Sequence, residues 1–355
     1  MSAPLTMGEL FAGYGGLGLG LSLLTDVRTA WVSEVDKGAC KVLARRFPDA
    51  PNLGDVTAVD WDDVEPVDVL TGGSPCQDLS EAGQRAGMRP GTRSGLWESM
   101  AHAIHHLQPS LVVWENVRGA LSANAYSHLE SGPGRVGDGA GRPALRALGR
   151  VLGDLATLGY DAQWQVVSAA DVGAPHLRER VFVLAHRRGA SADAARLISD
   201  RGRPARGWRP EPPDSHRLAL SLLPTPTVVD QGESHSLESW AEWTAQMREC
   251  HGNGNGHGRS LSVEARRSTS DHGAYADALT RWERALGRPA PAPTDQQGRL
   301  AAAFVEWMMG LPAGWVTSPD IGISRTAQFR MLGNGVVPQQ AALAVSGLAQ
   351  WAVAA

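Results

Sequence analysis

A glycine-rich turn between a short apolar run and a helix-like run constrains the fold of this chain more than any other feature. The apolar run covers residues 6–11 and predicts a buried strand, and Gly13, Gly15 and Gly18 follow it. Glycines at this spacing let the backbone turn sharply and approach a bound nucleotide closely, as in a dinucleotide-binding βαβ unit. The pattern therefore predicts an α/β fold with a Rossmann-like sheet. It indicates a nucleoside cofactor without specifying which one.

Two acidic residues follow at positions where such a cofactor would meet the next strands. A second predicted strand, residues 29–35, carries Glu34 about 20 residues after the first glycine, which is the usual place for a ribose-binding acid. A third predicted strand end, residues 52–56, carries Asp55, an acid suited to an adenine amino group. A nicotinamide oxidoreductase would show the same glycines and acids, so these residues alone leave that alternative open.

Two further strand ends carry chemically reactive side chains. Residues 67–70 predict a buried parallel strand, and Cys76 follows on a loop behind Pro75, which fixes its own φ. Residues 110–114 predict another strand, which Glu115 follows directly. If both strands belong to one parallel sheet, the two side chains can enter the same crevice. A thiolate and a carboxylic acid suit the addition of a nucleophile to an electron-poor ring. A buried, inert cysteine is the alternative for the thiol taken alone.

The order of these and several later motifs resembles the cytosine-C5 DNA methyltransferases. The motifs that carry the resemblance are Glu9–Gly16, Ser33–Asp36, Gly54–Val56, Gly73–Ser80, Arg93–Trp97, Glu115–Val117, Gly173–Arg180 and Gly333–Val337. The resemblance implies a Rossmann-like methyltransferase sheet with a smaller, irregular target-recognition domain. It implies transfer of a methyl group from S-adenosyl-L-methionine to C5 of cytosine at a specific DNA sequence. An RNA cytosine-C5 methyltransferase and a non-catalytic DNA-binding relative are the alternatives.

The resemblance also implies a role for each residue of the site. Cys76 would add to C6 of a cytosine flipped out of the duplex, and Glu115 would hold or protonate N3. Arg178 and Arg180 would stabilise anions near the thiolate or hold the target's O2 and phosphate, their alternative being a pair of surface charges. Asn116 would brace the loop that carries the thiol. The residues expected to bind S-adenosyl-L-methionine are Phe11, Gly13, Gly15, Glu34, Val35, Asp55, Val56, Pro75, Leu96, Asn334 and Val336.

Two positions depart from the family's usual pattern. His176 stands where the arginine motif commonly has glutamine, so a buried hydrogen bond is expected to be made differently there. Val35 stands where tryptophan often stacks on adenine. Neither departure removes a catalytic group.

Composition divides the chain into two domains. Residues 1–187 and 326–355 carry the motifs and are predicted to form the catalytic and cofactor-binding domain. Between residues 188 and 325 the strand–helix rhythm fades, and the early part of this segment is locally basic. The resemblance implies that this segment is the target-recognition domain and contacts DNA phosphates.

Several local patterns give narrower expectations. Residues 225–228 fit a recognition strand or an ordinary turn, the glycine-rich insertion 122–142 fits a mobile loop near DNA, and 250–258 favours a flexible loop over a zinc site. Trp240 and Trp243 fit helix packing, and residues 304–312 fit a helix that ends at a turn. The final segment, 337–354, predicts a helix that docks on the catalytic domain.

Charge and hydropathy fit an intracellular enzyme. The net charge is −4, and the three cysteines are too few and too scattered for a disulfide framework. No apolar run of about 18 residues and no secretory leader is present, so a cytoplasmic location in a bacterium or an infected host cell is expected. The expected partner is double-stranded DNA, with a cognate restriction endonuclease acting separately as the other candidate. No metal site, no membrane contact and a monomer are expected.

Overall fold

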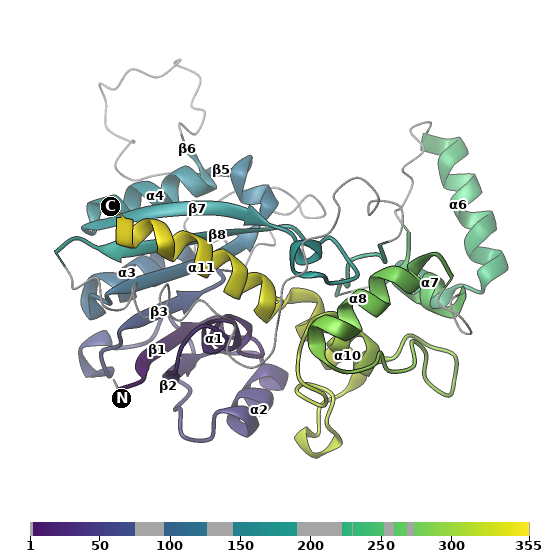
Figure 1. Cartoon of the computed structure of the whole chain (residues 1–355), viewed down its shortest axis with the longest axis horizontal. Coiled ribbons are helices and arrows are strands. Elements are labelled where there is room, and N and C mark those ends of the chain that lie inside the picture. Colours follow the sequence, from purple (N-terminus) through teal and green to yellow (C-terminus); the bar gives the residue numbers. More distant parts are fainter. Residues whose placement is uncertain are drawn as a thin grey trace.

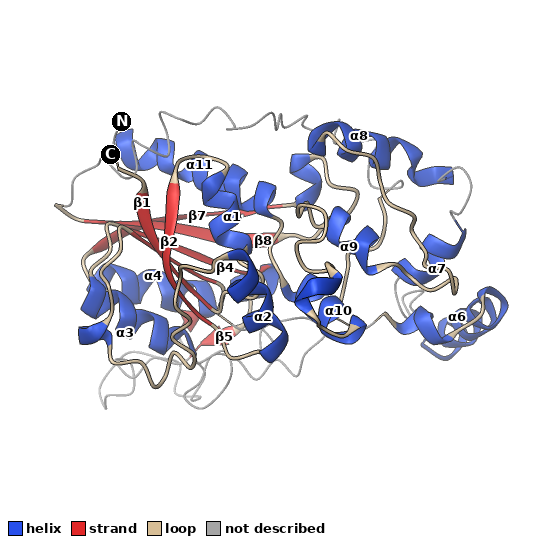
Figure 2. Cartoon of the chain, turned by 90° about the horizontal axis from the view of Figure 1, so that it is seen from below, coloured by secondary structure: helices blue, strands red, loops and turns tan. Residues whose placement is uncertain are grey.

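A six-stranded mixed sheet with helices on both faces forms the body of the protein (Figures 1 and 2). The computed structural model describes residues 3–74, 96–125, 145–189, 222–228, 230–251, 259–267 and 273–354. Pro75 and Cys76 lie outside the described residues, as do most of the insertion 122–142, the basic segment before residue 222 and residues 252–258.

The strands and helices have the following bounds. The strands are β1 (Leu5–Leu10), β2 (Val27–Ser33), β3 (Val69–Gly72), β4 (Leu111–Val117), β5 (Asn124–Ala125), β6 (Leu145–Arg146), β7 (Tyr160–Val167) and β8 (Arg180–Arg187). The α-helices are α1 (Gly16–Ser22), α2 (Lys37–Arg46), α3 (Trp97–Leu107), α4 (Ala147–Thr157), α6 (Leu237–His251), α7 (Leu261–Arg267), α8 (Ala276–Leu286), α9 (Ala302–Met308), α10 (Arg325–Asn334) and α11 (Pro338–Ala354). Short 3₁₀ helices are η1 (Trp61–Asp63), η3 (Arg118–Leu121), η5 (Ala169–Val172), η6 (Gln231–Ser234), η7 (Gly273–Tyr275) and η8 (Pro319–Ile321).

The strand order β2-β1-β3-β4-β8-β7 brings the predicted motif-bearing strands together at the centre of the sheet. Strands β2, β1, β3 and β4 are mutually parallel, whereas β8 runs antiparallel to both β4 and β7. Gly72 at the end of β3 is in register with Trp114 in β4. The parallel arrangement expected for the strands that precede Cys76 and Glu115 is therefore confirmed.

The predicted strand boundaries were wrong in several places. The strand predicted over residues 29–35 ends at Ser33, so Glu34 follows it, and the one predicted over residues 67–70 spans Val69–Gly72. Residues 52–56 form no strand and make only an isolated bridge between Asn52 and Val32. The Asn52 side chain accepts the Gly54 N–H, and Gly54 has φ +74°, so the backbone turns instead of extending. Strand β4 does not stop at Trp114, because β8 pairs with it as far as Val117. Glu115 therefore projects from a strand and not from a loop.

Each face of the sheet is covered by its own helices (Figure 2). Helices α1 and α11 pack against each other, and α11 also contacts β7 and β8. Helices α3 and α4 lie on the opposite face, where α4 contacts β7 and the indoles of Trp97 and Trp114 meet edge to face at 6.0 Å. The predicted docking of a C-terminal helix on the catalytic domain is confirmed by α11.

The regular secondary structure described between β8 and α10 consists of helices joined by loops. Helices α7, α8 and α9 pack around Trp282 and Trp307, both fully buried, and α9 confirms the helix expected over residues 304–312. This core is continuous with the residues of α1 and α11. Trp240 on α6 is buried, and the centroid of its ring lies 5.0 Å from that of Trp243, as expected for helix packing. Residues 225–228 adopt neither strand nor helix.

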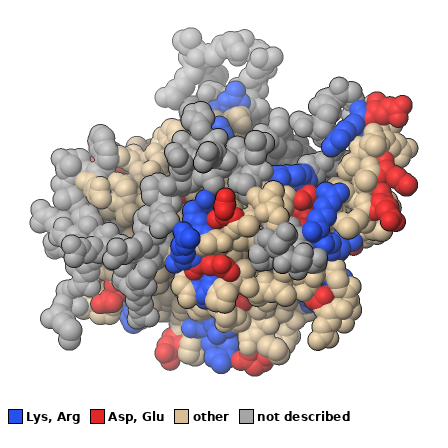
Figure 3. Space-filling model, turned by 45° about the vertical axis from the view of Figure 1, so that its right-hand side comes forward, with Lys and Arg blue, Asp and Glu red and all other residues tan. Residues whose placement is uncertain are grey.

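Neither a metal-binding cluster nor a membrane-spanning helix is found in the described segments. On the face drawn in Figure 3, basic and acidic side chains are interspersed. Within the described ranges no cluster of three or more His, Cys, Asp or Glu residues could hold a metal ion. No helix in the same ranges is both long enough and apolar enough to cross a membrane.

Candidate active site

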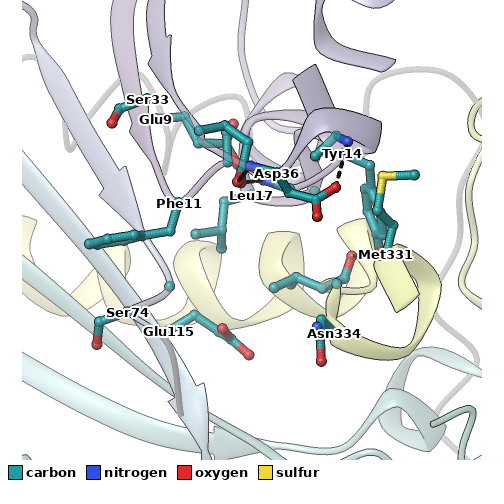
Figure 4. A pocket seen from close by; sticks show the side chains of 18 of the residues that line it. Glu9, Phe11, Tyr14, Leu17, Ser33, Asp36, Ser74, Glu115, Met331 and Asn334 are labelled. Carbon is teal, nitrogen blue, oxygen red and sulfur yellow. Dashed lines mark hydrogen bonds between the residues drawn. The ribbon is translucent and has the colours of Figure 1, made fainter. Parts of the chain in front are cut away.

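A cavity of about 630 Å³ opens at the carboxyl ends of the parallel strands, where the sequence places its reactive side chains (Figure 4). Figure 4 shows Glu115 and Asn334 on one side of it, with Glu9, Asp36 and Tyr14 across from them. The predicted site residues that line the cavity are Phe11, Gly13, Glu34, Val35, Asp55, Val56, Leu96, Glu115, Arg180, Asn334 and Val336. Gly15 and Arg178 are not among the lining residues.

The glycine turn takes the left-handed backbone that its sequence predicts. Gly13 has φ +55° and Gly15 has φ +82°, a region that residues with a Cβ rarely adopt. A Cβ at Gly15 would also lie 2.7 Å from the Phe47 ring, and one at Gly18 would lie 2.7 Å from a carboxyl oxygen of Glu9. The first glycine thus borders the cavity, while the other two allow the turn to pack on the residues behind it.

Glu34 is held at the cavity by backbone donors on both sides. One carboxyl oxygen accepts the Gly13 N–H at 2.8 Å, and the other accepts the Val35 and Asp36 N–H groups at 2.9 and 2.8 Å. These three hydrogen bonds fix the Glu34 carboxyl group at the wall of the cavity.

The side of the cavity lined by Val35 and Asp55 borders solvent. Val35 is 67% exposed, which leaves its side chain available for contact with a bound ligand. The Asp55 carboxylate accepts the backbone N–H and the hydroxyl of Thr57, which lowers the pKa of that carboxyl. Gly54 with its positive φ sets the turn that brings Asp55 to the rim.

The carboxyl-terminal motif closes the cavity by contacts to the glycine turn. The Tyr14 hydroxyl donates to the Val336 carbonyl at 2.8 Å, and the Tyr14 carbonyl accepts the Trp315 indole N–H at 2.8 Å. A Cβ at Gly335 would lie 2.0 Å from the Tyr14 ring. Only glycine therefore fits this approach between two segments from opposite ends of the chain.

Glu115 is buried and faces an arginine. Its carboxyl oxygen lies 3.1 Å from Arg180 Nε, and the side chains are 10% and 15% exposed. Burial raises the pKa of Glu115, while Arg180 and then Arg178 oppose that effect by favouring the carboxylate. A buried carboxyl group with a raised pKa is a candidate general acid.

The residues beside Glu115 anchor Ser74, the last described residue before Cys76. The Asn116 amide donates to the Ser74 carbonyl at 3.0 Å, and the Trp114 indole donates to the Ser74 hydroxyl at 3.1 Å. Gly73 lies against Glu115, since a Cβ there would be 2.9 Å from its carboxyl oxygen. The chain is thus fixed two residues before Cys76, and the bracing expected of Asn116 is visible in its bond to Ser74.

Arg178 has a different environment from Arg180. It is 3% exposed, has φ +37°, and donates to the carbonyls of Pro226, Gly333 and Gly335. Its own carbonyl accepts the Gln340 amide at 2.7 Å. Arg178 therefore ties the segment before α6 to the carboxyl-terminal wall of the cavity. The burial of Arg178 excludes, for this residue, the alternative that it is a surface charge.

The His176 ring is also fully buried, and its Nε2 lies 3.1 Å from the Met308 carbonyl. Burial lowers the pKa of His176 to about 3, so the ring is neutral near pH 7. The neutral imidazole thus makes one hydrogen bond to the end of α9, where the family pattern has the side-chain amide of a glutamine.

Sequence reasoning missed two buried groups at the cavity. Glu9 is 2% exposed, accepts the Gly18 N–H at 3.2 Å, and has its pKa raised by burial to about 8. Tyr14 is 1% exposed. Glu9 was the one charged residue in an otherwise apolar run, a signal for a special environment. Tyr14 had no comparable signal, because its partner lies 322 positions away.

Comparison with known proteins decides the family. Residues 5–345 match the family model of the C-5 cytosine-specific DNA methylases. The chain belongs to this family. It is a DNA cytosine-C5 methyltransferase, and the resemblance and the Rossmann-like fold class inferred from the sequence are confirmed.

Individual relatives agree with this assignment. Type II methyltransferase M1.ScrFI of Lactococcus lactis subsp. cremoris is 28% identical over 94% of this chain and 75% of its own length. Type II methyltransferase M.NlaIV of Neisseria lactamica is 29% identical, but the match spans 49% of this chain and 40% of that relative. The crystal structure of S. pombe Dnmt2 methyltransferase is 14% identical with a TM-score of 0.52, covers 98% of this chain and 99% of its own, and supports the fold alone.

Proposed function

We propose that this methyltransferase modifies C5 of cytosine at a specific sequence in duplex DNA, using S-adenosyl-L-methionine and the Cys76 thiol. One observation carries the proposal. A single cavity is lined by residues suited to a nucleoside cofactor and by the buried Glu115–Arg180 pair. A donor molecule and a target base bound there would lie side by side.

The lining residues fit S-adenosyl-L-methionine chemically. The fixed Glu34 carboxylate suits the ribose hydroxyls, Asp55 suits the adenine amino group, and Val35 and Val56 supply apolar contact for the ring. Phe11, Leu96 and Asn334 line the remaining wall. A volume of about 630 Å³ lies within the range of small-molecule sites. When bound, the cofactor supplies an electrophilic methyl group.

Cys76 and Glu115 activate the cytosine ring in this proposal. The Cys76 thiolate adds to C6, and Glu115 gives its proton to N3, which leaves an enamine whose C5 is nucleophilic. Once C5 carries the methyl group, water acting as a base takes the C5 proton, its bonding electrons stay in the ring, and the sulfur–C6 bond breaks. The electron pair of that bond returns to sulfur, and N3 returns its proton to Glu115. The aromatic ring and both side chains are thereby restored.

Arg180 and the groups around Ser74 position this machinery. Arg180 fixes the Glu115 carboxyl at 3.1 Å and is itself at the cavity, where it can donate to O2 of the base. Asn116 fixes the chain before Cys76 through its bond to Ser74. We assign Arg178 a positioning role, because its guanidinium donates to three backbone carbonyls.

The duplex partner and its recognition extend the proposal beyond the cavity. Because C5 and C6 of cytosine lie inside the helical stack, the target base must be flipped into the site. Residues 188–325 are proposed to read the sequence around it, and residues 1–187 with 326–355 to perform the reaction. We further propose that the enzyme acts as a monomer in the cytoplasm and that a cognate restriction endonuclease acts separately.

Covalent trapping on DNA that contains 5-fluorocytosine tests the central step. Fluorine at C5 cannot leave as the proton does, so the enzyme should remain attached to the DNA through Cys76. Wild type should form an adduct that survives denaturing electrophoresis, and Cys76→Ser should form none. Glu115→Gln should form it at least about a hundredfold more slowly, within the range usual for a general acid.

Controls separate the competing activities. Cys40→Ser changes a half-buried cysteine behind Glu34 and should trap normally. Methyl transfer from labelled S-adenosyl-L-methionine to genomic DNA, with bisulfite sequencing, should place 5-methylcytosine at one short sequence. Transfer to RNA but not DNA, or cofactor binding without any adduct, would overturn the proposal.

A further inference from the structure

The side chain of Tyr14 joins two walls of the cavity that come from opposite ends of the chain. One is the glycine turn that contains Tyr14, and the other is the carboxyl-terminal wall, residues 333–336. The Tyr14 hydroxyl donates to the Val336 carbonyl at 2.8 Å, and the two residues are 1% and 8% exposed. A hydrogen bond buried in this way is not readily replaced by water, so its loss is costly.

Tyr14 is also held through its backbone. Its carbonyl accepts the Trp315 indole N–H at 2.8 Å. Arg46 in turn donates to the Trp315 carbonyl at 2.9 Å, and its guanidinium lies 5.0 Å from the centre of the Trp315 ring. Tyr14 is thus fixed at both ends, by its carbonyl to the turn before η8 and by its hydroxyl to the carboxyl-terminal wall.

The two walls are closely packed around the Tyr14 ring. A Cβ at Gly335 would lie 2.0 Å from the ring, and a Cβ at Gly16 would lie 2.9 Å from the ring and 2.7 Å from the Val336 carbonyl. The ring therefore fills the space between two glycines, one from each wall. Because the hydroxyl reaches Val336 only when the walls are this close, the bond sets the spacing between them.

Tyr14 lies away from the residues proposed to bind adenine. Figure 4 shows Tyr14 and Asn334 at the end of the pocket away from Ser33. The Ser33 hydroxyl donates to the Gly54 carbonyl at 2.8 Å, beside Asp55, the proposed adenine contact. An adenine bound there directs the rest of the cofactor toward the other end of the pocket. Tyr14 and Asn334 would then border its methionine part.

Building on the proposed function, we propose that Tyr14 is a positioning residue for the methionine part of the cofactor. Its hydroxyl holds the carboxyl-terminal wall at a fixed spacing from the glycine turn. Asn334 lies two positions before Val336 and lines the cavity, so the same bond fixes the place of Asn334. The aromatic ring supplies packing, whereas the hydroxyl supplies the spacing. Phenylalanine at this position would retain the packing and lose the spacing.

Two ligands test this role by binding. S-adenosyl-L-homocysteine contains the amino acid part, whereas 5′-methylthioadenosine retains the adenosine and the sulfur but lacks that part. Isothermal titration should show that Tyr14→Phe weakens the binding of S-adenosyl-L-homocysteine about fivefold, as expected for one lost hydrogen bond. The affinity for 5′-methylthioadenosine should change by less than about twofold. In methyl transfer, the KM for S-adenosyl-L-methionine should rise by a larger factor than kcat falls.

Tyr160→Phe is the matched control. The Tyr160 hydroxyl donates to the Pro109 carbonyl at 2.7 Å in another buried bond, and Tyr160 is also 1% exposed. Neither Tyr160 nor Pro109 lines the cavity. Loss of this hydroxyl should lower the free energy of unfolding as Tyr14→Phe does but leave the affinity for both ligands as in wild type.

The outcomes separate this inference from the proposed function. Equal affinities of wild type and Tyr14→Phe for S-adenosyl-L-homocysteine would overturn the inference. Equal losses for the two ligands, or the same loss in Tyr160→Phe, would show that the hydroxyl only supports the fold and would overturn it as well. Failure of the wild type to bind S-adenosyl-L-homocysteine at all would instead overturn the proposed use of the cofactor.

Discussion

Glu9 is expected to make the stability of the protein depend on pH between about 4.5 and 8. Its carboxyl is buried at the end of β1, and burial raises its pKa from 4.5 to about 8. In the unfolded chain the group is solvated, so its ordinary pKa is restored. Between these two values the folded state holds a proton that the unfolded state has lost, and the free energy of unfolding therefore falls as pH rises. Below 4.5 both states are protonated and above 8 both are ionised, so the dependence ends at each limit.

The size of the effect follows from the shift. One pKa unit corresponds to about 1.4 kcal/mol, so a change from 4.5 to about 8 corresponds to roughly 5 kcal/mol. Glu9→Gln is neutral at every pH, and its amide oxygen can still accept the Gly18 N–H. The variant should match wild type near pH 4.5 and exceed its unfolding free energy by up to about 5 kcal/mol above pH 8.

Urea unfolding of both proteins at pH 5, 6, 7 and 8 measures this difference directly. Other titrating groups are common to the two proteins, so the difference between them isolates Glu9. Glu238→Gln, which makes the same change at an exposed glutamate on α6, is the control. A Glu9→Gln difference that is constant from pH 5 to 8 would refute the reasoning.

Three other substitutions probe separate contacts. Burial lowers the pKa of His176 to about 3, so the unfolding free energy of wild type falls as pH drops below 6.5. His176→Gln lacks this dependence, so its unfolding free energy relative to wild type should rise by about 2 kcal/mol from pH 7 to pH 5. Urea unfolding that gives the same difference at both pH values would contradict this. Glu306 is 2% exposed, and its carboxyl group accepts the Gly314 N–H at 2.8 Å and both the N–H and the hydroxyl of Thr317. Glu306→Ala should therefore lower the unfolding free energy by about 3–5 kcal/mol. A loss below about 1 kcal/mol would be inconsistent with those hydrogen bonds. Asn116→Ala removes the hydrogen bond to Ser74 and should lower the unfolding free energy by only about 1–2 kcal/mol. It should nevertheless slow trapping on 5-fluorocytosine DNA at least about tenfold. A trapping rate equal to that of wild type would show that Asn116 does not position the reactive residues.

The sequence predicted the arrangement of reactive groups better than the bounds of the strands that carry them. Glycines and acids at the ends of apolar runs follow from local backbone requirements, so the positions of Gly13, Glu34 and Asp55 at one cavity could be inferred without the structure. The extension of β4 through Val117 could not be inferred, because it depends on pairing with β8 more than 60 positions later. Short-range patterns do not contain such pairings.

The roles of the two motif arginines show the same limit. Arg178 and Arg180 are two positions apart in one motif, so from the sequence both were expected to have the same role. In the structure Arg180 faces Glu115, while Arg178 turns to carbonyls of residues 226, 333 and 335. The difference arises from the left-handed backbone at Arg178 and from partners in distant segments. Such contacts are fixed by tertiary packing and not by the motif.

The bond between Tyr14 and Val336 bears on how the enzyme is made in a cell. The two residues are 322 positions apart, and both line the cavity. A ribosome that releases the chain from its amino terminus exposes the glycine turn more than 300 positions before the wall formed by residues 333–336. Until those residues emerge, the nascent chain carries an incomplete cavity. The cavity is complete only once α11 has docked on α1.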